Sequence, residues 1–217
     1  MRTVSRFAAC CGALAAAAAA GAPVTCPPPD FATTTGFDLD TFVSAPWFIH
    51  QQMEVSYLPK SQNRCVRAVY ERKSKKSFWG YEIGVRNFAE DVAIPHTKRD
   101  SGSTLCAKVV DADSGKLKVA PCAIPPLLGG PYWVLDYDEE QGYALISGGP
   151  PKIVGEGGCR TGTGVNGSGL WIFTRSQDRD QKLIDRVRAI AAKKGFDLSV
   201  LNDVDQTDCG AAEIVQV

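Results

Sequence analysis

The chain has 217 residues, and its 24 Lys and Arg balance its 24 Asp and Glu, so the formal net charge at pH 7 is zero. This length fits one domain, or two at most. Neither half of the chain is strongly basic, which removes the electrostatic case for binding nucleic acid.

The first residues have the pattern of a targeting segment. Two arginines precede an alanine-rich apolar run over 7–20, and small residues follow it. This pattern predicts a cleaved signal peptide over 1–22 and therefore a secreted protein. A plastid transit peptide is an alternative, because no acidic residue occurs before Asp30, and lipidation at Cys10 or Cys11 is another.

Six of the eight cysteines lie beyond the predicted leader. An even number suits a disulfide framework in an oxidising compartment. The only histidines are His50 and His96, and no cysteine pair has the spacing of a zinc ligand set. We therefore expect disulfides, no metal and no cofactor.

Residues 23–46 are rich in Pro and Thr and predict an extended arm, with one turn of helix around 38–43. From 47 to 175 the pattern changes to short runs of aromatic and β-branched residues between turn formers, which is typical of an antiparallel barrel or sandwich. The candidate strands are 47–55, 65–72, 77–86, 90–96, 104–110, 116–121, 131–137, 142–147 and 169–175.

One hairpin is visible directly, because the runs CAKVV and KLKVAPC flank the turn sequence DADSG. Cys106 and Cys122 lie at equal distances from Ser114. If residues equidistant from the turn face each other, these two cysteines can form a disulfide across the hairpin.

Two other segments attract attention. Residues 148–169 are too rich in Gly and Pro for regular structure and predict a long loop, which contains a possible glycosylation site at Asn166. Residues 72–76, RKSKK, form a basic cluster in a predicted turn. Such a cluster is either a solvated turn or a contact site.

Residues 178–194 carry the one long helical pattern, with apolar residues at steps of three and four. Gly195 follows as the expected C-terminal cap. Short strands followed by one amphipathic helix predict a barrel with a helix packed on its outer wall. The tail, 195–217, then returns to Cys209.

Several blocks together resemble a known family. They are the arm CPPP (26–29), Trp47, NRCVRAVY around Cys65, PYWVLDYDEEQGYALI (131–146), WIFTR (171–175) and the tail block DLSVLNDVDQTDC. In this order they resemble the lipocalins, and most closely the apolipoprotein D-like group. The resemblance implies an all-β, eight-stranded antiparallel up-and-down barrel over 47–175 with a C-terminal helix outside it.

The resemblance also implies roles for individual residues. Cys65 would pair with Cys209, and Cys26 with Cys159. Arg175 would lie over the indole of Trp47 and close one end of the barrel. The implied wall of the ligand cavity consists of Ala68, Tyr70, Trp79, Tyr81, Tyr132, Tyr143, Trp171 and Phe173.

We therefore expect a non-catalytic carrier of one small hydrophobic molecule, such as a lipid, sterol, retinoid or carotenoid. One alternative is a secreted barrel that grips a protein receptor with its mouth loops. A lipocalin-fold enzyme is a weaker alternative, because no nucleophile can be placed beside either histidine. The sequence leaves membrane contact and the identity of the ligand open.

Overall fold

The computed structural model describes residues 24–111 and 113–210. The predicted leader, including Cys10 and Cys11, and the last residues of the tail lie outside this range. In the described part, no helix is both long enough and apolar enough to cross a bilayer.

Eight antiparallel strands form a closed barrel, in which each strand pairs with the next and the last pairs with the first. These strands are β1 (Trp47–Met53), β2 (Arg64–Arg72), β3 (Ile83–Glu90), β5 (Leu105–Asp111), β6 (Lys116–Pro121), β7 (Gly130–Asp138), β8 (Tyr143–Ser147) and β11 (Leu170–Thr174). Closure leaves no unpaired edge within the barrel. The expectation of an eight-stranded antiparallel barrel is confirmed.

Shorter elements surround the barrel. β4 (Lys98–Asp100) extends the hairpin of β3, β12 (Leu201–Asp203) pairs with β1, and β9 (Ile153–Val154) pairs with β10 (Cys159–Arg160) inside the long loop. Single turns of 3-10 helix occur at Lys60–Gln62, Gly102–Thr104, Pro126–Leu128 and Leu198–Val200. One end of the barrel is closed by α1 (Leu39–Val43), and we call the opposite end the mouth.

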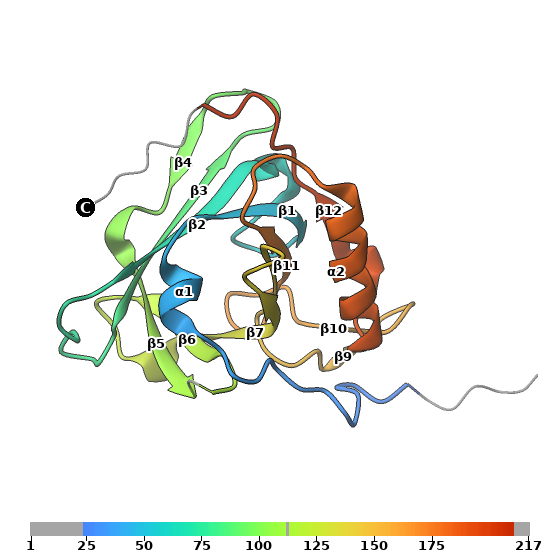
Figure 1. Cartoon of the computed structure of the whole chain (residues 1–217), viewed down its shortest axis with the longest axis horizontal. Coiled ribbons are helices and arrows are strands. Elements are labelled where there is room, and N and C mark those ends of the chain that lie inside the picture. The colour runs from blue at the N-terminus through green and yellow to red at the C-terminus, as the bar shows by residue number, and fades with distance from the viewer. Residues whose placement is uncertain (1–23, 112, 211–217) are drawn as a thin grey trace, which may run out of the picture.

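The helix α2 (Gln181–Lys193) packs on the outer face of β8 and β11 (Figure 1). Its buried residues Ile184, Val187 and Ala191 follow the predicted spacing of three and four. The helix begins later than expected, because the Asp180 side chain accepts from two backbone N–H groups and caps it. Gly195 ends it at φ +82°, a conformation that favours glycine, as expected.

Three disulfides hold the chain together, and they are the pairs that the sequence and the resemblance suggested. Cys26–Cys159 joins the arm to the long loop, and Cys65–Cys209 joins β2 to the tail. Such bonds form in an oxidising compartment.

The third disulfide, Cys106–Cys122, forms through a different register from the one expected. Cys106 faces Ala120, not Cys122, because the pairing of β5 with β6 is shifted by two residues. Cys122 follows the end of β6 and reaches Cys106 diagonally, with the two Cα atoms 5.0 Å apart. The bond was predicted, but the reason given for it was wrong.

Two predicted strands were misplaced. The run 77–86 begins as a turn, and β3 starts only at Ile83. The run 90–96 is not a strand beyond Glu90. It turns around Pro95 and His96, and His96 has φ +67°.

Candidate functional site

The barrel interior is lined by apolar side chains from every barrel strand. Among the predicted wall residues, five lie in this interior: Ala68, Tyr70, Tyr132, Trp171 and Phe173. On β11, Trp171 and Phe173 point inward while Leu170 and Ile172 point outward beneath α2, which follows from the alternation of a strand.

A β-bulge in β1 introduces a polar residue that alternation does not predict. The register with β11 shifts between Ile49 and Gln51, so Gln52 rather than Gln51 faces the interior, opposite the inward-facing Trp171. Gln52 is 1% exposed, and its Nε2 donates to Asn63 Oδ1 over 2.8 Å. Its Oε1 is buried without a hydrogen-bond partner.

A buried amide oxygen without a donor costs about 1–3 kcal/mol. Folded proteins pair nearly all such groups, so each exception calls for an explanation. Gln52 Oε1 is an acceptor held beside an indole ring inside a barrel, which is the arrangement expected of a group that receives a hydrogen bond from a ligand.

Tyr70 and Tyr132 form a second polar feature of the interior. Their hydroxyl oxygens are 2.6 Å apart, and burial raises the pKa of both phenols, so both stay protonated near neutral pH. One O–H donates to the other oxygen, which leaves the second O–H available. Tyr70 also contacts Phe42 of α1, so this pair lies deeper than Gln52.

Trp171 depends on the glycine two residues before it. Gly169 has φ +106°, and a Cβ built there would lie 2.0 Å from the Trp171 ring. A side chain at residue 169 would therefore displace the indole. The glycine-rich loop thus ends with a residue that lets Trp171 occupy the mouth side of the interior.

At the closed end, Arg175 Cζ lies 3.6 Å from the centre of the Trp47 ring. The guanidinium donates to Glu139 and to the carbonyl oxygens of Thr41, Phe42 and Ala45. The position implied by the resemblance is the observed one. Cation–π stacking and these bonds join β11 to α1 and close the barrel.

Three predicted wall residues lie elsewhere. Tyr143 faces outward beneath α2 and donates to Asp136, because on β8 the inward positions are Ala144 and Ile146. Tyr81 packs against the Cys106–Cys122 disulfide in a separate cluster. Trp79 is 38% exposed in the turn that precedes β3. These corrections have the same physical cause. When a strand starts at another residue than predicted, or shifts by one residue, its side chains point to the opposite face of the sheet.

Sequence reasoning missed Gln52 and its partner Asn63. A simple alternation from Trp47 assigns residues 47, 49, 51 and 53 to the interior and so excludes Gln52. The one available signal was the pair Gln51-Gln52 in a strand that is otherwise largely apolar.

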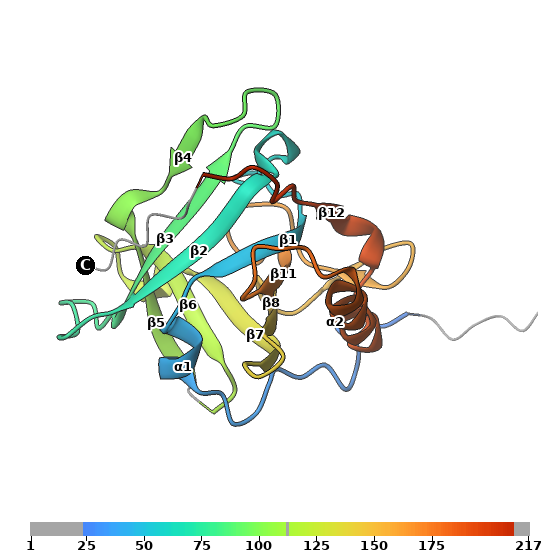
Figure 2. The same cartoon turned by 45° about the horizontal axis from the view of Figure 1, so that its top comes forward.

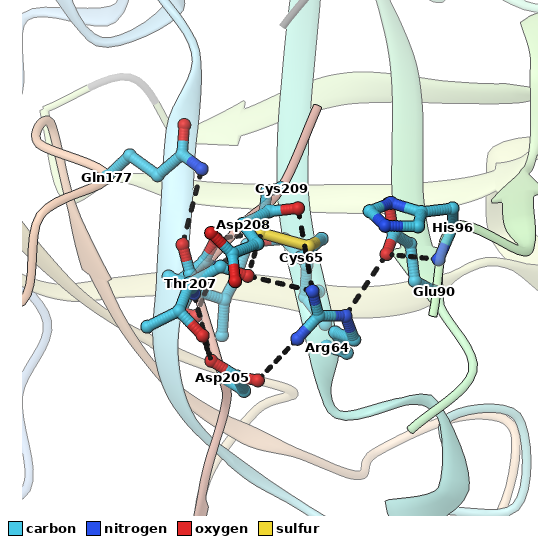
Figure 3. Close-up of a disulfide and its surroundings, with 12 residues drawn as sticks. Arg64, Cys65, Glu90, His96, Gln177, Asp205, Thr207, Asp208 and Cys209 are labelled. Atoms are coloured by element: carbon cyan, nitrogen blue, oxygen red, sulfur yellow. Dashed lines mark hydrogen bonds and ion pairs between the residues drawn. A yellow bond between two sulfur atoms is a disulfide. The ribbon is translucent and has the colours of Figure 1, made fainter. Parts of the chain in front are cut away.

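An ion cluster around the buried Arg64 fixes the tail at the side of the barrel (Figure 3). Arg64 donates to Glu90 over 3.2 Å, to Asp205 and to the backbone of Thr207, next to the Cys65–Cys209 disulfide.

Two open cavities lie on the outside of the barrel. One of about 560 Å³ lies beside the Arg64 cluster, between the tail and residues 60–63. A second, of about 350 Å³, lies beside the first turn of α2. Both are on the outer surface, and none of the predicted wall residues lines them.

The histidine and cysteine side chains of the described residues can be placed individually. His50 is fully buried on β1, with Nε2 3.1 Å from the Ser176 carbonyl oxygen. All six cysteines in the described residues are in disulfides. Within the same residues, no three His, Cys, Asp or Glu side chains gather as metal ligands.

No known family model matches the chain, and no curated protein matches it. Solved structures do. Lipocalin 12 from rat epididymis is 14% identical with a TM-score of 0.54, over 88% of this chain and 97% of that one. The chain has the lipocalin fold.

Two further structures with this fold are similar. Per a 4, a major cockroach allergen, is 16% identical with a TM-score of 0.54, over 84% of this chain and 96% of that one. Insecticyanin from the tobacco hornworm Manduca sexta is 16% identical with a TM-score of 0.53, over 85% and 87%. At these identities the likeness of this lipocalin-fold chain to them concerns the fold alone.

Proposed function

We propose that the protein is a non-catalytic lipocalin that carries one small, mainly apolar molecule inside its barrel. Eight-stranded barrels of this kind have room for one small ligand. The observation that carries the proposal is Gln52 Oε1, an unpartnered acceptor in an otherwise apolar interior.

The same interior supports a proposal for the class of ligand. An apolar body would contact Trp171, Phe173 and Ala68, and a hydroxyl or amine at one end would donate to Gln52. In a ligand that carries a second oxygen, the free O–H of the Tyr70–Tyr132 pair would donate to it. A sterol, a retinoid alcohol or a long-chain alcohol fits this description better than a pure hydrocarbon.

Entry of a ligand requires side chains to move, since the interior is packed with buried residues. We expect the Trp171 ring to move, because it lies at the mouth side of the interior and is still 9% exposed. Binding should therefore change the fluorescence of Trp171.

The remaining proposals concern family and location. The arm, the tail and the three disulfides support membership of the lipocalin family near the apolipoprotein D-like group. The leader and the disulfides support secretion, with a plastid lumen as the alternative. The lack of a thiol or histidine facing the interior among the described residues supports a role without catalysis.

The test is native mass spectrometry of the disulfide-bonded mature protein, followed by organic extraction and titration with a retinoid, a sterol, a fatty acid and a carotenoid. We expect one apolar ligand per chain, and weaker binding in Trp171→Ala while Tyr143→Phe, on the outer face, binds normally. Absence of any ligand in both assays would refute the carrier function.

A second candidate is a protein-binding mouth. Leu127 and Val165 are 82% and 75% exposed, and their loops are joined by a hydrogen bond from Asn166 Nδ2 to the Leu128 carbonyl oxygen. Exposed apolar residues gathered on two adjacent loops are typical of an interface. A stoichiometric protein partner whose binding is lost in Leu127→Asp, without change in ligand binding, would support this role.

A further inference from the structure

The hairpin between β2 and β3 exposes two aromatic rings. Phe78 is 91% exposed and Trp79 is 38% exposed, and their rings pack edge to face with centroids 4.8 Å apart. Figures 1 and 2 show this hairpin projecting from the barrel on the side away from α2. Adjacent exposed aromatic residues at a projecting tip indicate a contact site.

The turn that carries these rings is held in one conformation. Gly80 N–H donates to the Ser77 carbonyl oxygen over 2.8 Å, and Tyr81 N–H donates to Ser77 Oγ over 3.1 Å. Gly80 has φ +78°, which favours glycine. Tyr81 is fully buried and donates to the Ile124 carbonyl oxygen, so it anchors the tip to the barrel.

Positive charge surrounds the base of this tip. Lys75 and Lys76 are exposed, and the Lys108 ammonium of β5 lies beside Gly80. The acidic residue Glu82 lies 3.6 Å from Lys76 Nζ and so offsets part of this charge. Neither Lys75 nor Lys108 has a carboxylate within ion-pair distance among the described residues.

We propose that residues 72–82 form a docking tip for an anionic lipid surface. Phe78 and Trp79 would enter the interfacial region of the bilayer, where aromatic rings are favoured, and the lysines would lie at the level of the headgroups. Each lysine near an anionic membrane contributes about a fivefold gain in binding.

The shape of the tip favours a bilayer over a protein. The rings stand at the apex of a narrow, convex turn, with the lysines set back from it. A bilayer accepts an apex of this form anywhere on its surface, whereas a protein partner would need a matching pocket. Long lysine side chains can reach the headgroups while the rings are buried.

Docking through this tip also fixes the orientation of the barrel. The hairpin lies at the closed end, where Arg72 forms an ion pair with Asp40 of α1 over 3.3 Å. Tyr81 of the same hairpin donates to the Ile124 carbonyl oxygen, so docking would also bring the connection between β6 and β7 toward the bilayer.

The experiment is co-sedimentation of the disulfide-bonded mature chain with vesicles of phosphatidylcholine alone, and with an equal mixture of phosphatidylcholine and phosphatidylserine. We expect binding to the mixed vesicles, weakened by salt, and little binding to the neutral ones. Tryptophan emission should shift to the blue on binding. The shift should be reduced in Trp79→Phe, which keeps an aromatic ring and still binds.

Variants separate the contributions of the tip. The double variant Phe78→Ala, Trp79→Ala should lower vesicle binding by at least about tenfold. Lys75→Ser with Lys76→Ser should lower it by about twenty-fivefold. The matched controls are Val154→Ala, a 59% exposed apolar residue of β9 on the side of α2, and Lys182→Ser with Lys193→Ser on the exposed face of α2, and they should bind like the parent.

Three outcomes would overturn the proposal: no binding to either vesicle, equal losses in the control variants, or binding that the aromatic double variant leaves unchanged. The last outcome, together with equally tight binding to soluble heparin, would show a purely electrostatic contact. Near-ultraviolet circular dichroism of each variant verifies that the barrel is folded. The result does not depend on the carrier function, because no ligand is involved.

Discussion

At the closed end of the barrel, each donor nitrogen of Arg175 faces an oxygen, and Trp47 Nε1 donates to the Phe42 carbonyl oxygen over 2.9 Å. At the mouth side of the same interior, Gln52 Oε1 has no partner. The first region is complete without a ligand, whereas the second has an acceptor that a ligand can satisfy. The hydrogen bonding of buried polar groups therefore distinguishes the closed end, which holds the barrel together, from the mouth side, which we propose binds the ligand.

The largest expected effect is at the closed end. Trp47→Ala should lower the free energy of unfolding by about 3–5 kcal/mol, because Trp47 is fully buried against Phe42, Phe173 and Arg175. Denaturant unfolding measures the change. Trp79→Ala, at an exposed position, is the control and should change it by less than about 0.5 kcal/mol. Equal losses of the free energy of unfolding in Trp47→Ala and Trp79→Ala would contradict a stabilising role of the closed end.

Replacement of Arg175 tests the polar part of the closed end. Arg175→Met should cost about 2–3 kcal/mol, because it leaves Glu139 and several carbonyl oxygens without their donor. Arg175→Lys keeps the charge but cannot reach all these oxygens. Its free energy of unfolding should therefore lie between those of Arg175→Met and the parent. A Met variant as stable as the parent would show that the bonds contribute nothing.

At the mouth side, substitution should affect binding more than stability. Gln52→Leu removes one unpaired acceptor but takes the donor from Asn63 Oδ1, so stability should change by less than about 1 kcal/mol. Affinity for a long-chain alcohol should fall about tenfold, while affinity for the corresponding hydrocarbon should not fall. Fluorescence titration compares the two ligands, and equal losses for both would exclude Gln52 as the acceptor.

The smallest effect on the free energy of unfolding is expected at His50, on the outer side of β1. Burial lowers the pKa of His50 below its usual value near 6.5, and the hydrogen bond that Nε2 donates to the Ser176 carbonyl oxygen offsets only part of this effect. Nδ1 has no acceptor for the second proton of the imidazolium. The unfolded chain therefore takes up this proton at a higher pH than the folded chain. The stability that neutral His50 contributes is present above about pH 6.5 and is lost as the pH falls below it.

This dependence can be measured directly. Between about pH 7.5 and pH 5.5, the free energy of unfolding should fall in the parent and fall less in His50→Gln. The matched control is His96→Gln, in an exposed turn. Its free energy of unfolding should fall with pH as in the parent, because His50 is retained. An identical pH dependence in the parent and in His50→Gln would show that His50 does not titrate differently on folding.

Much of the framework follows from local patterns. The spacing of apolar residues predicts α2, and Gly195 marks its end because capping is a local interaction. The start, which Asp180 caps, lies three residues after the predicted one. The alternation of β11 places Trp171 and Phe173 on one face, since the strand has no bulge, and the resemblance correctly assigned this face to the interior. The even number of cysteines also indicates disulfides without any knowledge of the fold, because the count is a property of the composition and not of the geometry.

Features that depend on register could not be obtained in this way. The bulge between Ile49 and Gln51 turns Gln52 inward, and the true start of β3 leaves Phe78 and Trp79 in solvent. Both arise where one strand is aligned against another, and a shift of one residue reverses every side chain beyond it. The sequence by itself thus determined α2, most of the strands and the presence of disulfides. The resemblance added two of the disulfide pairs and the contact of Arg175 with Trp47. Only the tertiary structure decided which polar group faces the interior and which aromatic rings face water, because those depend on contacts between distant segments.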